Sequence, residues 1–396
     1  MKKSLLSLPA LWLCALLFAN QAGAITSSAD AQLAKSVPGA EEVAQTISLV
    51  TGVAISPLMG VGAVGAYQYF HAKTPEQRAK LPWFASPLFW VPALLLVGVC
   101  FVKDTAGTML PTVVKKPFDV AETVEHKISG LAATGAFVPI AASIFHAPGA
   151  AGASLSGLGF AAIDLHWLYN GIMVPVAMVA FVLVFLASNA INILILLSPF
   201  TTVDAALKSF RLFILSTVAV SAWANPWLGA AWALIVILIS WLIAGWSFRL
   251  SHFGLVFVWE FITRRCNRFT PEKTVNRMFL GRRIKKVPAR TYGKLTRDDQ
   301  GNLVLNYRPW LVLPERTLAL PEGKYAAGKG LFFSEIDKLE GDSAKIALLL
   351  PPRYRSHEEE LMKIYGLADV CPVGLRAAWQ WFKGLFGSGT SQPATV

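Results

Sequence analysis

Five blocks of apolar residues, nearly free of charged side chains, dominate the N-terminal part of the chain. They cover residues 47–70, 83–101, 128–145, 165–197 and 206–246. A helix needs about 20 apolar residues to cross a bilayer, so each block is close to or above the length of one span. The last block is long enough for two helices, and Asn225-Pro226 in its middle predicts a turn because the residue before a proline avoids the helical region. The pattern therefore predicts six hydrophobic helices.

The composition is that of a membrane protein. Hydrophobic residues make up 54% of the 396 residues and charged residues only 15%, against about 25% charged in an ordinary soluble domain. This balance excludes a soluble enzyme, a disordered protein and a fibrous protein. We attribute the net charge of +12 to orientation in a membrane and expect no nucleic-acid binding. No CxxC pair is present, so no disulfide framework, metal site or cofactor is predicted from Cys14, Cys100, Cys266 and Cys371.

The N-terminus has the pattern of a secretory signal. Lys2 and Lys3 precede an apolar stretch over residues 5–18, and Ala22-Gly23-Ala24 has the small-residue pattern that signal peptidase cleaves. We therefore predict a signal peptide over residues 1–24, cleavage before Ile25 and a periplasmic lead over residues 25–46. An uncleaved first membrane helix is the alternative. The signal predicts a bacterial inner-membrane protein whose mature N-terminus lies outside.

Charge distribution then constrains the topology of the membrane domain, which we place at residues 47–250. Six crossings from an outside N-terminus would leave the C-terminus outside, yet a Lys/Arg cluster follows the last helix, and such clusters stay cytoplasmic. The cluster comprises Arg249, Arg264, Arg265, Arg268, Lys273, Arg277, Arg282, Arg283, Lys285, Lys286 and Arg290. One block must then fail to cross, and the candidate re-entrant segment is 83–101, which contains Pro87 and Pro92. The predicted fold class is an α-helical integral membrane bundle of five to seven membrane helices, with this re-entrant segment, followed by a small β-rich cytoplasmic C-terminal domain.

Glycines are frequent in the first apolar block, at Gly52, Gly60, Gly62 and Gly65. Small residues let helices approach closely in lipid, where packing replaces the hydrophobic effect. We therefore interpret these glycines as helix-packing positions rather than as the wall of a substrate pore.

The C-terminal part changes character after a basic linker predicted over residues 251–286. Residues 294–296 and 303–307 alternate apolar and polar side chains around a turn-rich cluster at 298–302, which predicts a β-hairpin. Further strands are predicted at 310–313, 317–320, 330–334 and 345–350. Ser356 starts a predicted helix that runs to about Tyr365, with Glu358 and Glu359 in its first turn. Residues 287–370 are therefore predicted to form a small β-rich cytoplasmic domain of the barrel or split-barrel kind.

An amphipathic helix is predicted over residues 371–388, and a disordered tail over 389–396. Aromatic side chains lie near one face of this helix and basic side chains flank that face, a pattern typical of helices that lie in the membrane surface. The predicted membrane-surface residues are Arg376, Trp379, Phe382, Lys383 and Phe386. Packing of the helix against the β-rich domain is the alternative.

Two segments resemble catalytic motifs, but each lacks a residue that the motif requires. His357-Glu358-Glu359-Glu360-Leu361 has leucine where a zinc metalloprotease helix has its second histidine, and Ser154-Leu155-Ser156-Gly157 lacks the first glycine of an intramembrane serine protease motif. No GxxxxGK[ST] sequence is present, which removes ATP-driven transport within this chain. We therefore predict that the protein is not an enzyme.

Polar residues at or near membrane depth are functional candidates because they are costly there. The densest group comprises Lys103, Asp104, Asp119, Glu122, Glu125 and His126, and a second group comprises Asp164, His166 and Asn170. These nine residues form the candidate polar membrane site, with a solvated interfacial face as the alternative. Asn189 and Asn192 lie deeper in the same block as His166, and we expect them to hydrogen-bond between helices.

A series of short motifs follows one order along the chain. The motifs are Leu81-Pro82-Trp83-Phe84-Ala85-Ser86-Pro87, Val91-Pro92-Ala93-Leu94-Leu95-Leu96, Lys103-Asp104, Phe118-Asp119 and Gly130-Leu131-Ala132-Ala133. Over about residues 47–250 this order resembles domain of unknown function family 4126, a family of bacterial multi-spanning membrane proteins. That family has no established activity, so the resemblance implies a membrane architecture and no catalytic residue.

Two functional hypotheses follow. The first is a transporter or channel-like protein for an ion or small solute, with a cytoplasmic regulatory module. The second is a non-catalytic membrane scaffold or anchor that presents its β-rich domain to a protein or lipid partner. The expected partners are the lipid bilayer, anionic lipid at the basic cytoplasmic face, a protein partner of the C-terminal domain and a second copy in a homo-oligomer.

Overall fold

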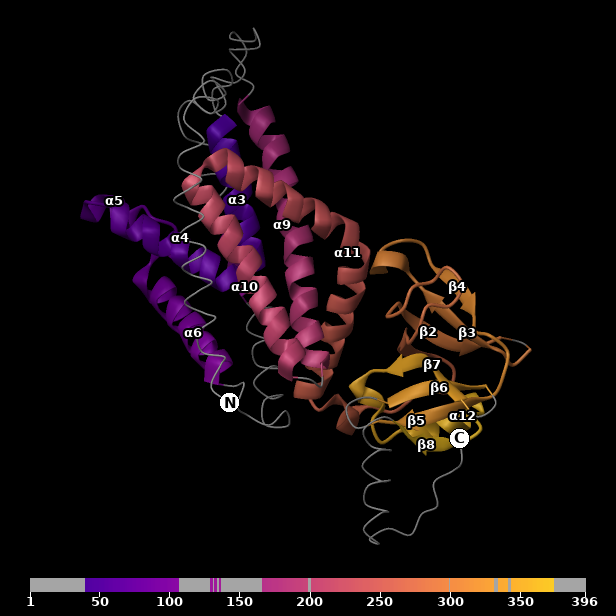
Figure 1. Cartoon of the computed structure of the whole chain (residues 1–396). Helices are drawn as coiled ribbons and strands as arrows, with labels where there is room; N and C mark the ends of the chain where they lie inside the picture. Colours follow the sequence, from indigo (N-terminus) through magenta and orange to yellow (C-terminus); the bar gives the residue numbers. More distant parts are fainter. Residues whose placement is uncertain are drawn as a thin grey trace. The chain divides into compact units, whose positions relative to one another are not determined.

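A computed structural model of the chain describes residues 40–106, 166–198, 201–298, 300–330, 334–340 and 343–373, with helical positions 129–130, 132–133 and 135–136. The chain divides into two compact units, Met1–Ser247 and Phe248–Val396. The described residues of the first unit are helical, and the second unit contains a β-sheet (Figure 1). The predicted signal peptide lies outside the described residues, and the part of the predicted lead from Ala40 onward belongs to the first described helix.

Helices of very different lengths make up the first unit. They are α3 (Ala40–Ile55), α4 (Pro57–His71), α5 (Pro75–Ala79), η1 (Trp83–Ala85), α6 (Pro87–Ala106), α9 (His166–Leu197), α10 (Thr201–Ala224) and the start of α11 (Pro226–Ile262). Three segments of the described residues are long and apolar enough to cross a membrane: Val174–Leu197, Thr202–Ala224 and Pro226–Ile262. These helices identify the chain as a membrane protein. Within the described residues there are three candidate spans, fewer than the five to seven that the sequence predicted.

The first apolar block is broken, which explains part of this difference. Ser56 adopts φ −136° and ψ 87°, outside the helical region, because Pro57 follows it. The block therefore forms α3 of 16 residues and α4 of 15 residues, each shorter than a span needs. Ser188 of α9 donates a hydrogen bond to the carbonyl oxygen of Ile55 at the break, at 2.7 Å. The bond satisfies a backbone acceptor at the end of α3, which lipid could not do.

The second apolar block forms η1 and then α6. Helix α6 runs unbroken over 20 residues although Pro92 lies inside it. A re-entrant segment must reverse the direction of the chain within the membrane. The described residues contain no such turn in this block after Ser86. Within the residues whose side chains the structure describes, the apolar part of α6 covers Pro87–Gly98.

Glycines allow the close packing of this region, as the sequence indicated. A Cβ at Gly60 would lie 2.7 Å from the Cα of Val53, and a Cβ at Gly65 would overlap the carbonyl oxygen of Phe84. Helices α3, α4, α9 and α10 and η1 share one buried apolar cluster that includes Val53, Phe84 and Phe181. The first block therefore packs through its glycines.

The turn predicted at Asn225-Pro226 is confirmed, and it joins α10 to α11. The side-chain oxygen of Asn225 accepts hydrogen bonds from the backbone N–H groups of Trp227 (2.8 Å) and Leu228 (3.2 Å), which caps α11. Trp232 of α11 donates its indole N–H to the hydroxyl of Thr217 of α10 at 2.9 Å. Helix α11 has 37 residues, or about 55 Å, whereas the hydrocarbon core of a bilayer is about 30 Å thick.

The second unit contains an eight-stranded mixed sheet, and β1 lies in its middle. The strands are β1 (Asn276–Leu280), β2 (Tyr292–Arg297), β3 (Leu303–Tyr307), β4 (Arg316–Ala319), β5 (Tyr325–Lys329), β6 (Ser334–Glu340), β7 (Ser343–Leu350) and β8 (Val370–Pro372). Their order is β4-β3-β2-β1-β7-β6-β5-β8, and every pair is antiparallel except β5 and β8. Strand β1 lies inside the predicted linker, so the sheet starts before residue 287.

Several predicted elements of this unit are confirmed. Strands β2, β3, β4 and β7 occur where expected, and the predicted closing helix is α12 (Glu358–Tyr365). The hairpin turn is closed by Asp298, whose carboxylate accepts hydrogen bonds from the backbone N–H groups of Gln300 and Asn302. The strand expected at 310–313 is wrong, because η4 (Pro309–Leu311) occupies this segment.

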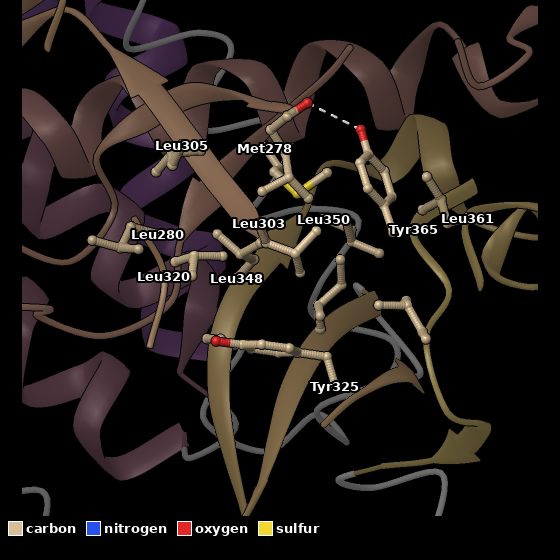
Figure 2. Packing of buried hydrophobic residues seen from close by; sticks show 14 of the residues in the cluster. Met278, Leu280, Leu303, Leu305, Leu320, Tyr325, Leu348, Leu350, Leu361 and Tyr365 are labelled. Carbon is tan, nitrogen blue, oxygen red and sulfur yellow. Dashed lines mark hydrogen bonds between the residues drawn. The ribbon is translucent and has the colours of Figure 1, made fainter. Parts of the chain in front are cut away.

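One apolar core holds the sheet and α12 together (Figure 2). Leu318 of β4 and Tyr325 of β5 belong to the same cluster although their strands lie far apart in the sheet order, so the sheet curves around this core. Leu361 and Tyr365 of α12 enter it from the helix. The core thus includes residues from both halves of the sheet.

Two carboxylates lie buried together on β6. Glu335 and Asp337 flank the position of Gly328 on β5, since a Cβ there would lie 2.8 Å from Glu335 Cγ and 3.0 Å from Asp337 Oδ2. Burial raises the pKa of Glu335 to about 7, with a further contribution from the charge of Asp337, and burial raises the pKa of Asp337 to about 6. The folded chain therefore holds these protons more tightly than an unfolded chain does.

We predict that Gly65→Ala lowers the midpoint temperature of unfolding in detergent. The new methyl group would meet the backbone of Phe84, and overpacking of this kind costs about 1–3 kcal/mol. Gly98→Ala is the control, because nothing lies within 4 Å of its Cβ position and alanine favours a helix. Equal midpoints for both variants would contradict the packing assigned to Gly65.

We also predict that the second unit loses stability as the pH rises from 5 to 8. Between the ordinary carboxyl pKa values and about 7, the folded state keeps protons that the unfolded state releases, and one pKa unit corresponds to about 1.4 kcal/mol. Asp337→Asn should reduce this dependence without abolishing it, because burial still raises the pKa of Glu335; the measurement is urea unfolding at each pH. Glu322→Gln, at an exposed carboxylate, should leave it unchanged; a flat profile in the unsubstituted protein would refute the prediction.

Candidate anion-binding site

Most residues of the candidate polar membrane site lie outside the described residues. These are Asp119, Glu122, Glu125, His126 and Asp164, and the membrane-surface residues Arg376, Trp379, Phe382, Lys383 and Phe386 also lie outside. Lys103 and Asp104 belong to the end of α6, and His166 and Asn170 belong to the start of α9. The structure describes the backbone of these four residues.

Of the two deeper asparagines, only Asn192 has the expected hydrogen bond between membrane helices, since the buried side-chain oxygen of Asn189 has no partner among the described residues. Arg211 of α10 donates a hydrogen bond to the side-chain oxygen of Asn192 of α9. Lys208 and Asp204, one and two turns before Arg211 on α10, are also buried. The described part of the first unit therefore contains a small polar cluster between α9 and α10 that the sequence indicated only through Asn192.

A pocket of about 500 Å³ lies in the second unit. It is lined by the residues after α11, by β1 and β2, and by η5 (Pro352–Tyr354), which precedes α12. The lining residues are Arg265, Phe269, Glu272, Val275, Asn276, Arg277, Lys294, Arg353 and Tyr354. Four of these side chains are cationic and one is a carboxylate, so the pocket is strongly basic.

The strand register brings two of the cations face to face. Arg277 of β1 lies directly opposite Lys294 of β2. Like charges at directly opposed positions of an antiparallel pair destabilise a sheet. Arg265 adds a third exposed cation, and none of these three side chains forms an ion pair with a described carboxylate. An anion bound between them would relieve this repulsion.

The fourth cation, Arg353, is buried, and its charge is paired with a carboxylate. Its guanidinium forms an ion pair with Glu260 in the last turn of α11, and its backbone N–H donates to the other oxygen of that carboxylate at 3.1 Å. The side chain of Glu260 is only 2% exposed and that of Arg353 only 10%. The guanidinium also lies 5.8 Å from the ring centroid of Phe269, on the pocket wall. This pair fixes η5 against the end of α11.

A network of hydrogen bonds fixes the residues at the base of the pocket. The amide of Asn276 donates to the backbone oxygen of Glu272 (2.7 Å) and to the hydroxyl of Tyr365 (2.9 Å), and its oxygen accepts from the backbone N–H of Glu272 (3.2 Å). Tyr365 in turn donates to the backbone oxygen of Leu295 at 3.0 Å. Since Asn276 is buried and all its partners are fixed, the basic side chains project from a rigid base.

The pocket was not predicted from the sequence. Arg265 and Arg277 were recognised as members of the basic cluster, but only as a signal for orientation and for anionic lipid at the cytoplasmic face. Lys294 and Arg353 lie far along the chain, and only the pairing of β1 with β2 and the position of η5 bring them to the same place. The density of basic residues between 264 and 290 was the one available signal for an anion site.

No family model matches the chain, and no curated protein or solved structure is significantly similar to it.

Removal of Glu260 should be strongly destabilising. Glu260→Ala leaves the buried guanidinium of Arg353 without its partner, and breaking a buried pair in this way costs about 3–5 kcal/mol. The measurement is urea unfolding of the full chain in detergent. Glu315→Ala serves as the control, since its pair with Arg308 is exposed and worth less than about 1 kcal/mol. Similar effects of the two substitutions would show that the buried pair does not hold η5 in place.

Proposed function

We propose that this protein is a bacterial inner-membrane protein whose helices anchor a cytoplasmic β-rich unit that binds a phosphate-bearing anion. The basic pocket is the observation that carries the proposal. The cytoplasmic side follows from the Lys/Arg residues after the last span, because such residues near a span stay in the cytoplasm. In this proposal the protein is a membrane anchor that presents its β-rich unit to a ligand.

A phosphate group fits the chemistry of the pocket. Arg265, Arg277 and Lys294 are exposed cations around one cavity, and arginine binds phosphate through two parallel hydrogen bonds. The volume of about 500 Å³ is in the range of small-molecule sites. The same chemistry is offered by a soluble phosphate compound and by the headgroup of an anionic lipid.

Transport of an ion or small solute is the second candidate function. The polar cluster between α9 and α10 favours it, because Arg211, Asn192 and the buried Lys208 lie within otherwise apolar membrane segments. Solute flux into proteoliposomes that Arg211→Gln abolishes and Arg277→Gln leaves unchanged would favour this function.

We predict that pyrophosphate stabilises the full-length protein in detergent against heat, beyond sodium chloride at equal ionic strength. Arg277→Gln and Lys294→Gln should each raise the dissociation constant by at least about tenfold, since a hydrogen bond to a charged group is worth about 1.5–3 kcal/mol. Without pyrophosphate each substitution should slightly stabilise the protein, because it removes the like-charge repulsion. Lys324→Gln, at an exposed lysine outside the pocket, is the matched control.

The source of the phosphate can be distinguished in the same system. In nanodiscs of phosphatidylcholine with phosphatidylglycerol, a bound lipid headgroup should weaken pyrophosphate binding relative to phosphatidylcholine alone. Equal binding in both nanodiscs indicates a soluble ligand. Pyrophosphate binding that survives both pocket substitutions would overturn the proposal.

A further inference from the structure

Four consecutive apolar side chains project from the second unit at η4. Trp310, Leu311, Val312 and Leu313 are 46%, 40%, 85% and 45% exposed. They lie between β3 and the edge strand β4, in the segment for which the sequence predicted a strand. A soluble domain would bury such a run, and a contiguous exposed apolar patch marks an interaction site for protein or membrane.

The backbone is strained in order to hold these side chains outward. Trp310 (φ 54°) and Leu311 (φ 63°) both adopt the left-handed conformation, which is unfavourable for bulky residues. The conformation is fixed by hydrogen bonds from the N–H of Leu311 to the oxygen of Arg308 and from the N–H of Leu313 to the oxygen of Pro309, at 3.0 and 3.1 Å. Strain that persists in this way is typical of functional segments.

The loop contacts α11, the last of the candidate membrane spans. The ring of Trp310 lies against the ring of Phe248, with centroids 4.8 Å apart. Phe248 is 22 residues after Pro226 (248 − 226), the first residue of α11. At 1.5 Å per residue this is about 33 Å of helix, close to the thickness of the hydrocarbon core. Phe248 is therefore expected near the membrane surface if the span begins at the start of α11.

The residues around the loop fit an interfacial position. Tryptophan is enriched at the boundary between hydrocarbon and headgroups, and flanking basic side chains reach toward the headgroups. Arg308 and Arg316 flank the apolar run, and both are exposed. Arg308 has the carboxylate of Glu315 at 3.8 Å, and among the described residues Arg316 forms no ion pair.

We propose that the loop Trp310–Leu313 inserts into the interfacial layer of the bilayer that α11 crosses. The second unit then has two membrane attachments, the covalent one through α11 and this loop. The occupant of the patch is lipid, and the inference is independent of the anion pocket because none of the loop residues lines it.

The test uses the full-length protein with Cys14, Cys100, Cys266 and Cys371 replaced by serine, reconstituted in nanodiscs of phosphatidylcholine and phosphatidylglycerol. A single cysteine introduced by Val312→Cys carries the polarity-sensitive dye NBD. Val312 is a suitable position because it is the most exposed of the four side chains and contributes nothing to the core. Gln300→Cys in the exposed hairpin turn is the matched control.

At Val312 we expect blue-shifted NBD emission, at least twofold stronger quenching by doxyl-labelled lipid than at Gln300, and at least twofold weaker quenching by iodide. Equal iodide quenching at both positions, without lipid quenching, would overturn the proposal. Shielding from iodide without quenching by doxyl lipid would also overturn it and show a protein partner on the patch. A disulfide between two copies of the unlabelled Val312→Cys variant would identify that partner as a second copy.

Discussion

The buried ion pair between Glu260 and Arg353 is the interaction on which the second unit depends. A carboxylate at the end of an apolar helix cannot be buried alone, because the cost of removing a charge from water is several kcal/mol. Arg353 compensates it, and the backbone N–H of the same residue binds the second oxygen. The pair thereby fixes η5, and with it Tyr354 and one wall of the basic pocket. Glu260 neutralises the charge of Arg353 inside the unit. The side chains of Arg265, Arg277 and Lys294 form no ion pair with a described carboxylate, so their charges are available to a ligand.

Local signals predicted the parts of the fold that local chemistry determines. Helix α9, the turn at Asn225-Pro226 and the hairpin closed by Asp298 are encoded by apolar length, by proline and by turn residues. The break at Ser56 was missed although Pro57 follows it, because the apolar run continues on both sides. Strands β1, β5, β6 and β8 were not predicted, and β8 (Val370–Pro372) covers the start of the helix predicted over residues 371–388. β1 lies in a charge-rich segment, and β6 has buried Glu335 and Asp337, so neither alternates apolar and polar residues.

The site was less predictable than the fold because it depends on contacts between distant residues. Asn192 was expected to hydrogen-bond between helices, and its bond with Arg211 confirms this. The pairing of Arg277 with Lys294 follows from strand register, which a hydrophobic pattern cannot specify where the strand is charged. The position of Arg353 depends on Glu260, 93 residues earlier in the chain. No local motif relates these residues.

The length of α11 has a consequence for where the protein can reside. A helix with 37 residues contains more apolar length than one bilayer core can cover, and such hydrophobic mismatch is relieved by tilting or by local thickening of the lipid. A thicker membrane would cover more of α11 before the helix ends at Ile262. The distance between the lipid surface and the basic residues beyond that end would then shrink. Membrane thickness would thus set how far these residues extend into the aqueous phase, and it would favour some membranes over others for this protein.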